Sequence, residues 1–295
     1  MANVVFHKSV LLKEVLEVLD PKPNKKYIDA TIGGGGHTQG ILEKGGVVLG
    51  IDLDPEAIEY CQKGLISYLE EKKLLLSQGN FTDLAKIASR LGYERVSGIL
   101  FDLGVSSHQI EKAERGFSYL RDTTLDMRMD PKLKVTAADL VNALNEGELY
   151  ELFTRLGEEP YARRLARAIS KSRINKQIKK SSELIEIIQK NSPGYGRVHP
   201  SIPRVFQALR IAVNDELNNL KIGLIESLGL LEKGGKLVVI SFHSLEDRIV
   251  KNFFKGKAEE ERIEIMTKKP ILASVEELNL NPRARSAKMR VAKII

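Results

Sequence analysis

Short apolar runs alternate with amphipathic segments in the N-terminal part of this 295-residue chain. Four runs have the length and composition of buried strands in a parallel sheet: residues 27–30, 47–52, 74–77 and 98–102. The segments between them have helical spacing, with glycine or acidic residues at the breaks: residues 38–44, 54–63 and 81–91. This alternation predicts right-handed crossovers and a doubly wound, Rossmann-like α/β sheet.

A long stretch without a convincing strand separates the fourth apolar run from a fifth, at residues 236–241. Proline and glycine cluster near its end, and one long helix with an apolar face is expected from Pro203 through Leu224. Four segments within the stretch have helical periodicity: residues 137–144, 147–156, 161–171 and 182–190. The sequence therefore predicts an all-helical domain, residues 110–205, inserted into an α/β domain of residues 1–109 and 206–295.

The composition is that of a globular protein with a basic excess, since 46 Lys and Arg face 39 Asp and Glu. The formal net charge of +7 favours polyanionic partners, although good solubility alone also explains it. The single cysteine, Cys61, fits a reducing compartment. The N-terminal residues lack the apolar core of a signal peptide, and no apolar stretch is long enough to cross a bilayer. A cytoplasmic location without a membrane partner is expected.

A glycine-rich turn is expected where the first strand ends and a helix begins. Asp29 closes the strand, and four consecutive glycines begin at Gly33. Glycine permits a tight turn and lets the backbone approach a ligand that a Cβ would repel. Asp52 then ends the second strand, where a carboxylate can accept both hydroxyls of a ribose. The pair predicts a nucleoside-containing ligand.

Two cofactor classes suit this arrangement. Dinucleotide sites carry a spaced glycine motif whose helix N-terminus holds a pyrophosphate. Here the acidic Asp29 precedes the turn, and its charge suits the sulfonium and amino group of S-adenosylmethionine while repelling a pyrophosphate. The methyl donor is therefore the favoured ligand. A turn that only permits tight packing, with Asp29 capping a helix, stays open as the structural alternative.

The acceptor site is expected at the carboxyl ends of the strands, where doubly wound sheets bind ligands. Asp102 ends the fourth strand, and with Ser106 it could aim an exocyclic amine at the methyl donor; both could instead satisfy loop backbone groups. His243 follows the fifth strand as a residue that positions the acceptor base or takes a proton. Ser244 and Asp247 have the spacing of a helix capping box. The sequence shows no Cys/His cluster with metal-ligand spacing, and this chemistry needs no metal.

Residues 161–182 contain eight basic residues and no acidic one. Leu165, Ala166 and Ile169 have the spacing of a buried stripe, which directs the basic side chains outward. A solvated face is the ordinary interpretation, but the missing acidic partners favour phosphate binding. The candidate RNA-binding residues are Arg163, Arg164, Arg167, Lys171 and Arg173, with Arg283 and Arg285 near the C-terminus. There, Arg283 and Arg285 form a second basic group together with Lys288 and Arg290.

Ordered blocks along nearly the whole chain, from His7 to Arg290, resemble the RsmH (MraW) family of bacterial ribosomal-RNA methyltransferases. The blocks are residues 29–37, 98–107, 115–118, 125–130, 206–211, 241–248 and 285–288. The resemblance implies a class I methyltransferase fold, S-adenosylmethionine as the donor, and S-adenosylhomocysteine as the product. It implies the N4 amino group of a cytidine in 16S ribosomal RNA as the acceptor, near the decoding centre of the small ribosomal subunit.

The resemblance also implies a set of donor contacts, and patterning alone does not give two of them. By pattern, Phe81 belongs to the core and Gln109 to the surface. The implied contacts are Gly35, Gly36, His37, Asp52, Phe81, Asp102 and Gln109. Two other classes stay open, a nicotinamide-dependent oxidoreductase and an RNA-binding assembly factor with a vestigial donor pocket. A homodimer also stays open.

Overall fold

The computed structural model describes residues 9–106, 109, 112, 115–193 and 199–295. It divides into two compact units, Met1–Ser106 with Leu217–Ile295, and Ser107–Glu216. The second boundary lies later than the expected one at 205–206. The reason is that helix α11 (Ser201–Asn214), which the sequence assigned to the α/β domain, packs against α8 (Glu146–Gly157) of the helical unit.

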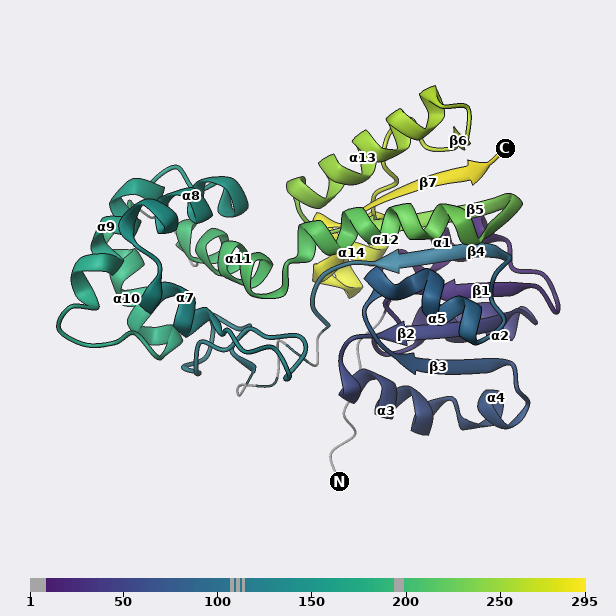
Figure 1. The fold of residues 1–295 in the computed structure, drawn as a ribbon, viewed down its shortest axis with the longest axis horizontal. Helices are drawn as coiled ribbons and strands as arrows, with labels where there is room; N and C mark the ends of the chain where they lie inside the picture. The colour runs from purple at the N-terminus through teal and green to yellow at the C-terminus, as the bar shows by residue number, and fades with distance from the viewer. Residues whose placement is uncertain (1–8, 107–108, 110–111, 113–114, 194–198) are drawn as a thin grey trace. The chain divides into compact units, whose positions relative to one another are not determined.

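The first unit is built on one seven-stranded sheet, with strand order β3-β2-β1-β4-β5-β7-β6 (Figure 1). The pairings from β3 to β5 are parallel, and β7 is antiparallel to both of its neighbours. This confirms the predicted Rossmann-like fold class and the five expected strands. The bounds are β1 (Lys26–Asp29), β2 (Val47–Asp52), β3 (Leu74–Gln78), β4 (Val96–Asp102), β5 (Leu231–Ser241), β6 (Ile263–Ile265) and β7 (Lys288–Ile294).

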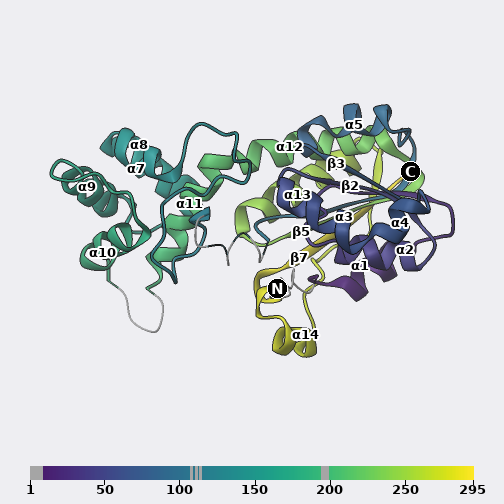
Figure 2. The same cartoon turned by 90° about the horizontal axis from the view of Figure 1, so that it is seen from below.

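Helices cover both faces of this sheet, and each face has its own apolar core. Figure 2 shows α5 (Leu84–Arg90) and α12 (Glu216–Leu230) on one side and α1 (Leu12–Leu19) and α2 (Gly36–Glu43) on the other. Leu224 belongs to the first core and Ile41 to the second, and both are fully buried. The remaining helices are α3 (Pro55–Gly64), α4 (Ile66–Glu70), η1 (Phe81–Asp83), α13 (Ser244–Glu259), α14 (Val275–Leu280) and η3 (Pro282–Ser286).

The second unit is helical throughout its named elements, as the patterning predicted. Its helices are α7 (Ala137–Ala143), α8, α9 (Ala162–Ser172), α10 (Ser181–Asn191) and α11. Local chemistry explains where they begin: Thr136 with Asp139 and Asn145 with Glu148 form reciprocal capping boxes at the starts of α7 and α8. Within the described ranges, no helix combines the length and the apolar character needed to cross a membrane.

The single long helix expected from Pro203 is two helices. Asp215, with a φ angle of 48°, separates α11 from α12, and a left-handed residue ends the regular hydrogen bonding of a helix. Just before the break, Asn214 holds an irregular loop: its side-chain oxygen accepts the Met129 N–H at 2.7 Å, and its amide donates to the Met127 carbonyl at 2.7 Å. The apolar stripe continues across the break, so periodicity alone could not reveal it.

Candidate active site

The turn after β1 is folded tightly around its glycines. Gly33 and Gly35 have φ angles of 49° and 76°, in the left-handed region that favours glycine. The Gly33 N–H donates to Oδ2 of Asp52 at 2.9 Å, and its carbonyl accepts from Sγ of Cys61 at 3.3 Å. A Cβ on Gly35 would lie 3.0 Å from the same sulfur. Helix α2 then begins at Gly36 with a glycine as its N-cap, so no N-cap side chain occupies the first N–H groups of the helix.

Asp52 ends β2 beside this turn. Its Oδ2 accepts the Gly33 N–H and its Oδ1 accepts the Asp54 N–H, both at 2.9 Å. Burial raises the pKa of Asp52 to about 6. A carboxylate has about four acceptor positions, so each oxygen retains capacity for a further hydrogen bond. Two backbone contacts therefore fix the group in place while leaving it able to accept two hydroxyls.

Asp29 is held inside the protein, with only 1% of its surface exposed. Its Oδ2 accepts from the Thr38 hydroxyl at 2.8 Å, and its Oδ1 accepts the Thr31 N–H at 3.3 Å. Burial raises its pKa to about 6. These contacts support the structural alternative for Asp29, in which it holds the turn against α2. Its negative charge would then attract a cationic ligand electrostatically, without touching it.

Asp102 ends β4 beside His37 of α2. The Val10 carbonyl accepts from Nε2 of His37 at 2.9 Å, so Nε2 carries the proton, and Nδ1 lies 3.6 Å from Oδ2 of Asp102. Burial raises the pKa of Asp102 well above its usual range, with Asp29 and Glu246 adding to the shift, and burial lowers the pKa of His37 to about 4. Oδ1 of Asp102 is buried and has no hydrogen-bond partner among the described residues.

The other expected site residues are divided between the two units. Phe81 is half-buried, with its ring edge-on to Phe101 at a centroid distance of 5.5 Å and against Gly223. Ser106, half-buried, is the last residue of the first unit's N-terminal segment. Gln109 belongs to the helical unit and is buried, which overturns the surface position that patterning suggested. Their contacts with a donor stay predictions.

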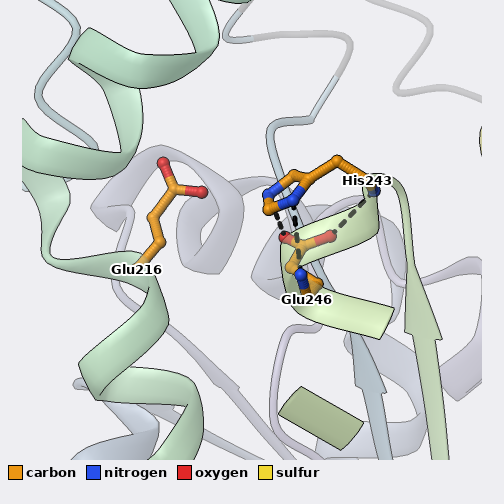
Figure 3. A group of neighbouring side chains, drawn as sticks. All are labelled: Glu216, His243 and Glu246. Atoms are coloured by element: carbon orange, nitrogen blue, oxygen red, sulfur yellow. Dashed lines mark hydrogen bonds and ion pairs between the residues drawn. The ribbon is translucent and has the colours of Figure 1, made fainter. Parts of the chain in front are cut away.

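His243 caps helix α13, and Figure 3 shows its ring over Glu246. The Glu246 N–H donates to Nδ1 at 3.3 Å, while the Glu246 carboxylate accepts the N–H groups of Phe242 at 2.8 Å and His243 at 3.3 Å. The expected box of Ser244 and Asp247 was wrong by one residue, because the imidazole takes the place of a hydroxyl acceptor.

The same contacts limit what the His243 ring can do. Since Nδ1 accepts an N–H, the proton of the neutral ring lies on Nε2, which is 3.2 Å from Oε1 of Glu246 but not aligned for a hydrogen bond. The lone pair of the ring is therefore occupied, which favours positioning over proton acceptance. Figure 3 also draws Glu216, whose two carboxylate oxygens are bound by the Arg210 guanidinium, each at 2.9 Å.

Three of the eight basic residues of 161–182 have acidic partners, contrary to the expectation from the segment alone. Glu146 of α8 lies 3.3 Å from Nε of Arg167, and Asp122 lies 3.2 Å from Nζ of Lys180. Glu183 of α10 pairs with Lys176. These acidic partners come from outside the segment and meet it only in the folded chain, so the segment alone could not reveal them.

Once these ion pairs are set aside, fewer basic residues of 161–182 are left to bind phosphate. Arg173 is half-buried and donates to the Val141 carbonyl at 2.7 Å, so it helps hold the helices together. The Arg163 guanidinium lies over the ring of Tyr150, 5.1 Å from its centroid. Four exposed basic residues have no acidic partner in the described part of the chain: Arg163, Arg164, Lys171 and Lys179. We call the three of them that lie on α9, Arg163, Arg164 and Lys171, the α9 basic face.

The C-terminal basic group is also smaller than its sequence suggests. Arg290 is buried on β7 and its Nε donates to Asp247 at 2.6 Å, with Lys288 3.7 Å from the same carboxylate. Arg283 is half-buried in η3, whereas Arg285 is exposed. Arg285 is therefore the member of the group best placed to meet a polyanion.

Several residues that hold the site in place were overlooked in the sequence. The Thr31 hydroxyl accepts the Asp102 N–H at 2.6 Å and so joins the glycine turn to β4. Thr38 lies nine residues after Asp29, in the first turn of α2, and its hydroxyl donates to Asp29. A hydroxyl residue at this spacing from a strand-terminal aspartate could have been recognised in the sequence. Val10 reaches His37 across 27 residues through its backbone carbonyl, for which no sequence pattern exists.

Comparison with known proteins shows the family of this chain. The model of the MraW methylase family matches residues 4–295. A protein of Syntrophotalea carbinolica named ribosomal RNA small subunit methyltransferase H is 45% identical, with 99% of each chain covered. A protein of the same name from Geobacter sulfurreducens is 46% identical, covering 97% of this chain and 98% of its own. The chain belongs to the MraW methylase family.

Proposed function

We propose that this protein is an S-adenosylmethionine-dependent methyltransferase that methylates the N4 amino group of a cytidine in 16S ribosomal RNA, in the cytoplasm. The observation that carries the donor assignment is the set of three carboxylates, Asp29, Asp52 and Asp102, around the glycine turn. None of the three forms an ion pair with a lysine or arginine in the described ranges. Such a site suits a cationic ligand and disfavours a pyrophosphate.

The residues present fit this donor. Asp52 would accept the two ribose hydroxyls, Phe81 would flank the adenine, and the first N–H groups of α2, including those of Gly36 and His37, would meet a carboxylate. The bound donor supplies an electrophilic methyl group. Asp102 and Ser106 would hold the acceptor amine, so alignment carries most of the catalysis. The cytidine must leave its stack to reach this site, which costs least in an unpaired loop.

The direct test incubates the purified protein with labelled donor and small ribosomal subunits from a strain that lacks the enzyme. We expect label in one 16S cytidine, recovered as N4-methylcytidine on nucleoside digestion. Particle binding without label would favour the assembly-factor alternative. Binding of NADH without binding of S-adenosylmethionine would favour the oxidoreductase.

The α9 basic face is expected to bind RNA phosphates. Changing Arg163, Arg164 and Lys171 together to glutamine should weaken RNA binding and flatten its dependence on salt, because each phosphate contact releases bound counterions. Filter binding over a salt series measures both. Lys176, which already pairs with Glu183, is the matched control: Lys176→Gln should change the slope little. An unchanged slope in the triple variant would place the RNA surface elsewhere.

His243 is expected to act through helix α13. Asparagine is among the strongest N-cap residues, so His243→Asn should keep the stability of the protein, whereas His243→Ala should lower it by about 1 kcal/mol. Urea unfolding measures this difference. If the asparagine variant is stable but loses as much methyl transfer as the alanine variant, the ring itself takes part in the chemistry.

A further inference from the structure

Asp102 and His37 face each other in a way that favours a proton between them. Nε2 of His37 donates to the Val10 carbonyl, so Nδ1 directs its lone pair toward Oδ2 of Asp102, 3.6 Å away. A lone pair facing a carboxylate oxygen is repulsive, whereas a carboxylic acid O–H would donate to it. The geometry thus favours one shared proton.

The surroundings place that proton on Asp102. Its Oδ1 is buried without a hydrogen-bond donor among the described residues, and an ionised oxygen there would lose its hydration with nothing in return. Among the described residues, the charged groups that raise the pKa of Asp102 are Asp29 of β1 and Glu246 of α13, both acidic. The imidazole of His37, 4% exposed, is equally poor at holding a positive charge. The direction of both pKa shifts agrees.

We infer that, without a donor, Asp102 is a neutral carboxylic acid whose O–H is directed toward Nδ1 of His37, and that a cationic donor binds with release of the Asp102 proton to solvent. This inference rests on the proposed donor. A positive ligand close to Asp102 stabilises its carboxylate, so binding of the ligand and loss of the proton are linked.

The same link between the ligand charge and the protonation of Asp102 would let Asp102 take up a proton during turnover. Methyl transfer forms the N–C bond, breaks the S–C bond and leaves a neutral thioether, while the methylated amine carries a positive charge and one proton too many. The Asp102 carboxylate, no longer facing a cation, can accept that proton and again donate to His37. Asp102 would then be the proton acceptor of the reaction, with His37 as its positioning residue.

Calorimetry of S-adenosylmethionine binding in buffers of different ionisation enthalpy tests the inference by counting protons. We expect the wild type to release about one proton more than Asp102→Asn near pH 8, where Asp29 and Asp52, with pKa values of about 6, are already ionised. Asparagine suits the comparison because its amide can donate to Nδ1 of His37 as the neutral acid does, but it cannot ionise. Asp83→Asn, an exposed change in η1, is the control and should match the wild type.

Equal proton release from the wild type and Asp102→Asn would overturn the inference while leaving the donor assignment intact. Absence of binding to the wild type would instead remove the proposed function. If Asp102→Asn binds S-adenosylmethionine too weakly for calorimetry, infrared spectroscopy of the ligand-free proteins tests the inference instead. The infrared carbonyl band of a protonated carboxyl should be present in the ligand-free wild type near pH 8 and missing from the variant. Identical spectra would contradict the neutral acid.

Discussion

Replacing Asp52 with alanine is expected to weaken binding of S-adenosylmethionine by at least about tenfold, which corresponds to about 1.4 kcal/mol. Two effects add. The variant loses the acceptor for the ribose hydroxyls, and the Gly33 and Asp54 N–H groups lose the carboxylate that holds them at 2.9 Å. The glycine turn is then less well ordered before the ligand arrives. Calorimetry or equilibrium dialysis measures the change.

Thr38→Val separates these two effects. It removes the 2.8 Å hydrogen bond to Asp29, which also steadies the turn, but leaves Asp52 untouched and preserves the shape of the side chain. We expect a smaller loss of affinity than in Asp52→Ala. Unchanged affinity in the Asp52 variant would show that the ribose lies elsewhere, and equal losses in both variants would attribute the effect to the turn alone.

Replacing Gly116 with alanine is expected to destabilise the helical unit by roughly 2–4 kcal/mol. Gly116 has a φ angle of 71°, and a Cβ there would lie 2.3 Å from the Thr124 carbonyl oxygen and 2.6 Å from the Asp126 nitrogen. Both obstacles are backbone atoms, and neighbouring hydrogen bonds keep them in place: the Asp126 carbonyl accepts the Ala137 N–H at 2.9 Å. Neither strain nor clash can be relieved by rotating a side chain.

Urea unfolding gives the size of this effect, and hydrogen exchange followed by mass spectrometry gives its place. Faster exchange should be concentrated in residues 115–135. Gly229→Ala is the control, because a Cβ there meets nothing within 4 Å and alanine is the better helix former. A Gly116 variant as stable as the wild type would mean that this loop adopts another backbone conformation in solution.

The helices and strands that could be predicted from the sequence are those whose burial produces a local pattern of apolar residues. The strands of the parallel sheet are short apolar runs because both faces are covered, and the helices of the second unit show a clear buried stripe. The antiparallel pair β6 and β7 was missed. Arg290 looked like a surface cation in the sequence, whereas in the fold it is buried against Asp247.

The candidate site shows the same division. Glycines and strand-terminal carboxylates such as Asp52 and Asp102 have local signatures, so the sequence was enough to find them. The protonation states of these carboxyl groups could not be predicted from the sequence. The environment of Asp102 depends on His37 and Glu246, which come from α2 and α13 and are brought together only by folding. The ion pairs on α9 were hidden for the same reason, since Glu146 and Asp122 lie outside the segment.

The donor site is tested most directly by a crystal structure of the protein soaked with S-adenosylhomocysteine. We expect the adenosyl group at the turn formed by residues 33–36, with the ribose hydroxyls on the carboxylate of Asp52. Electron density for the ligand at another place, or a ribose that does not touch Asp52, would contradict this expectation.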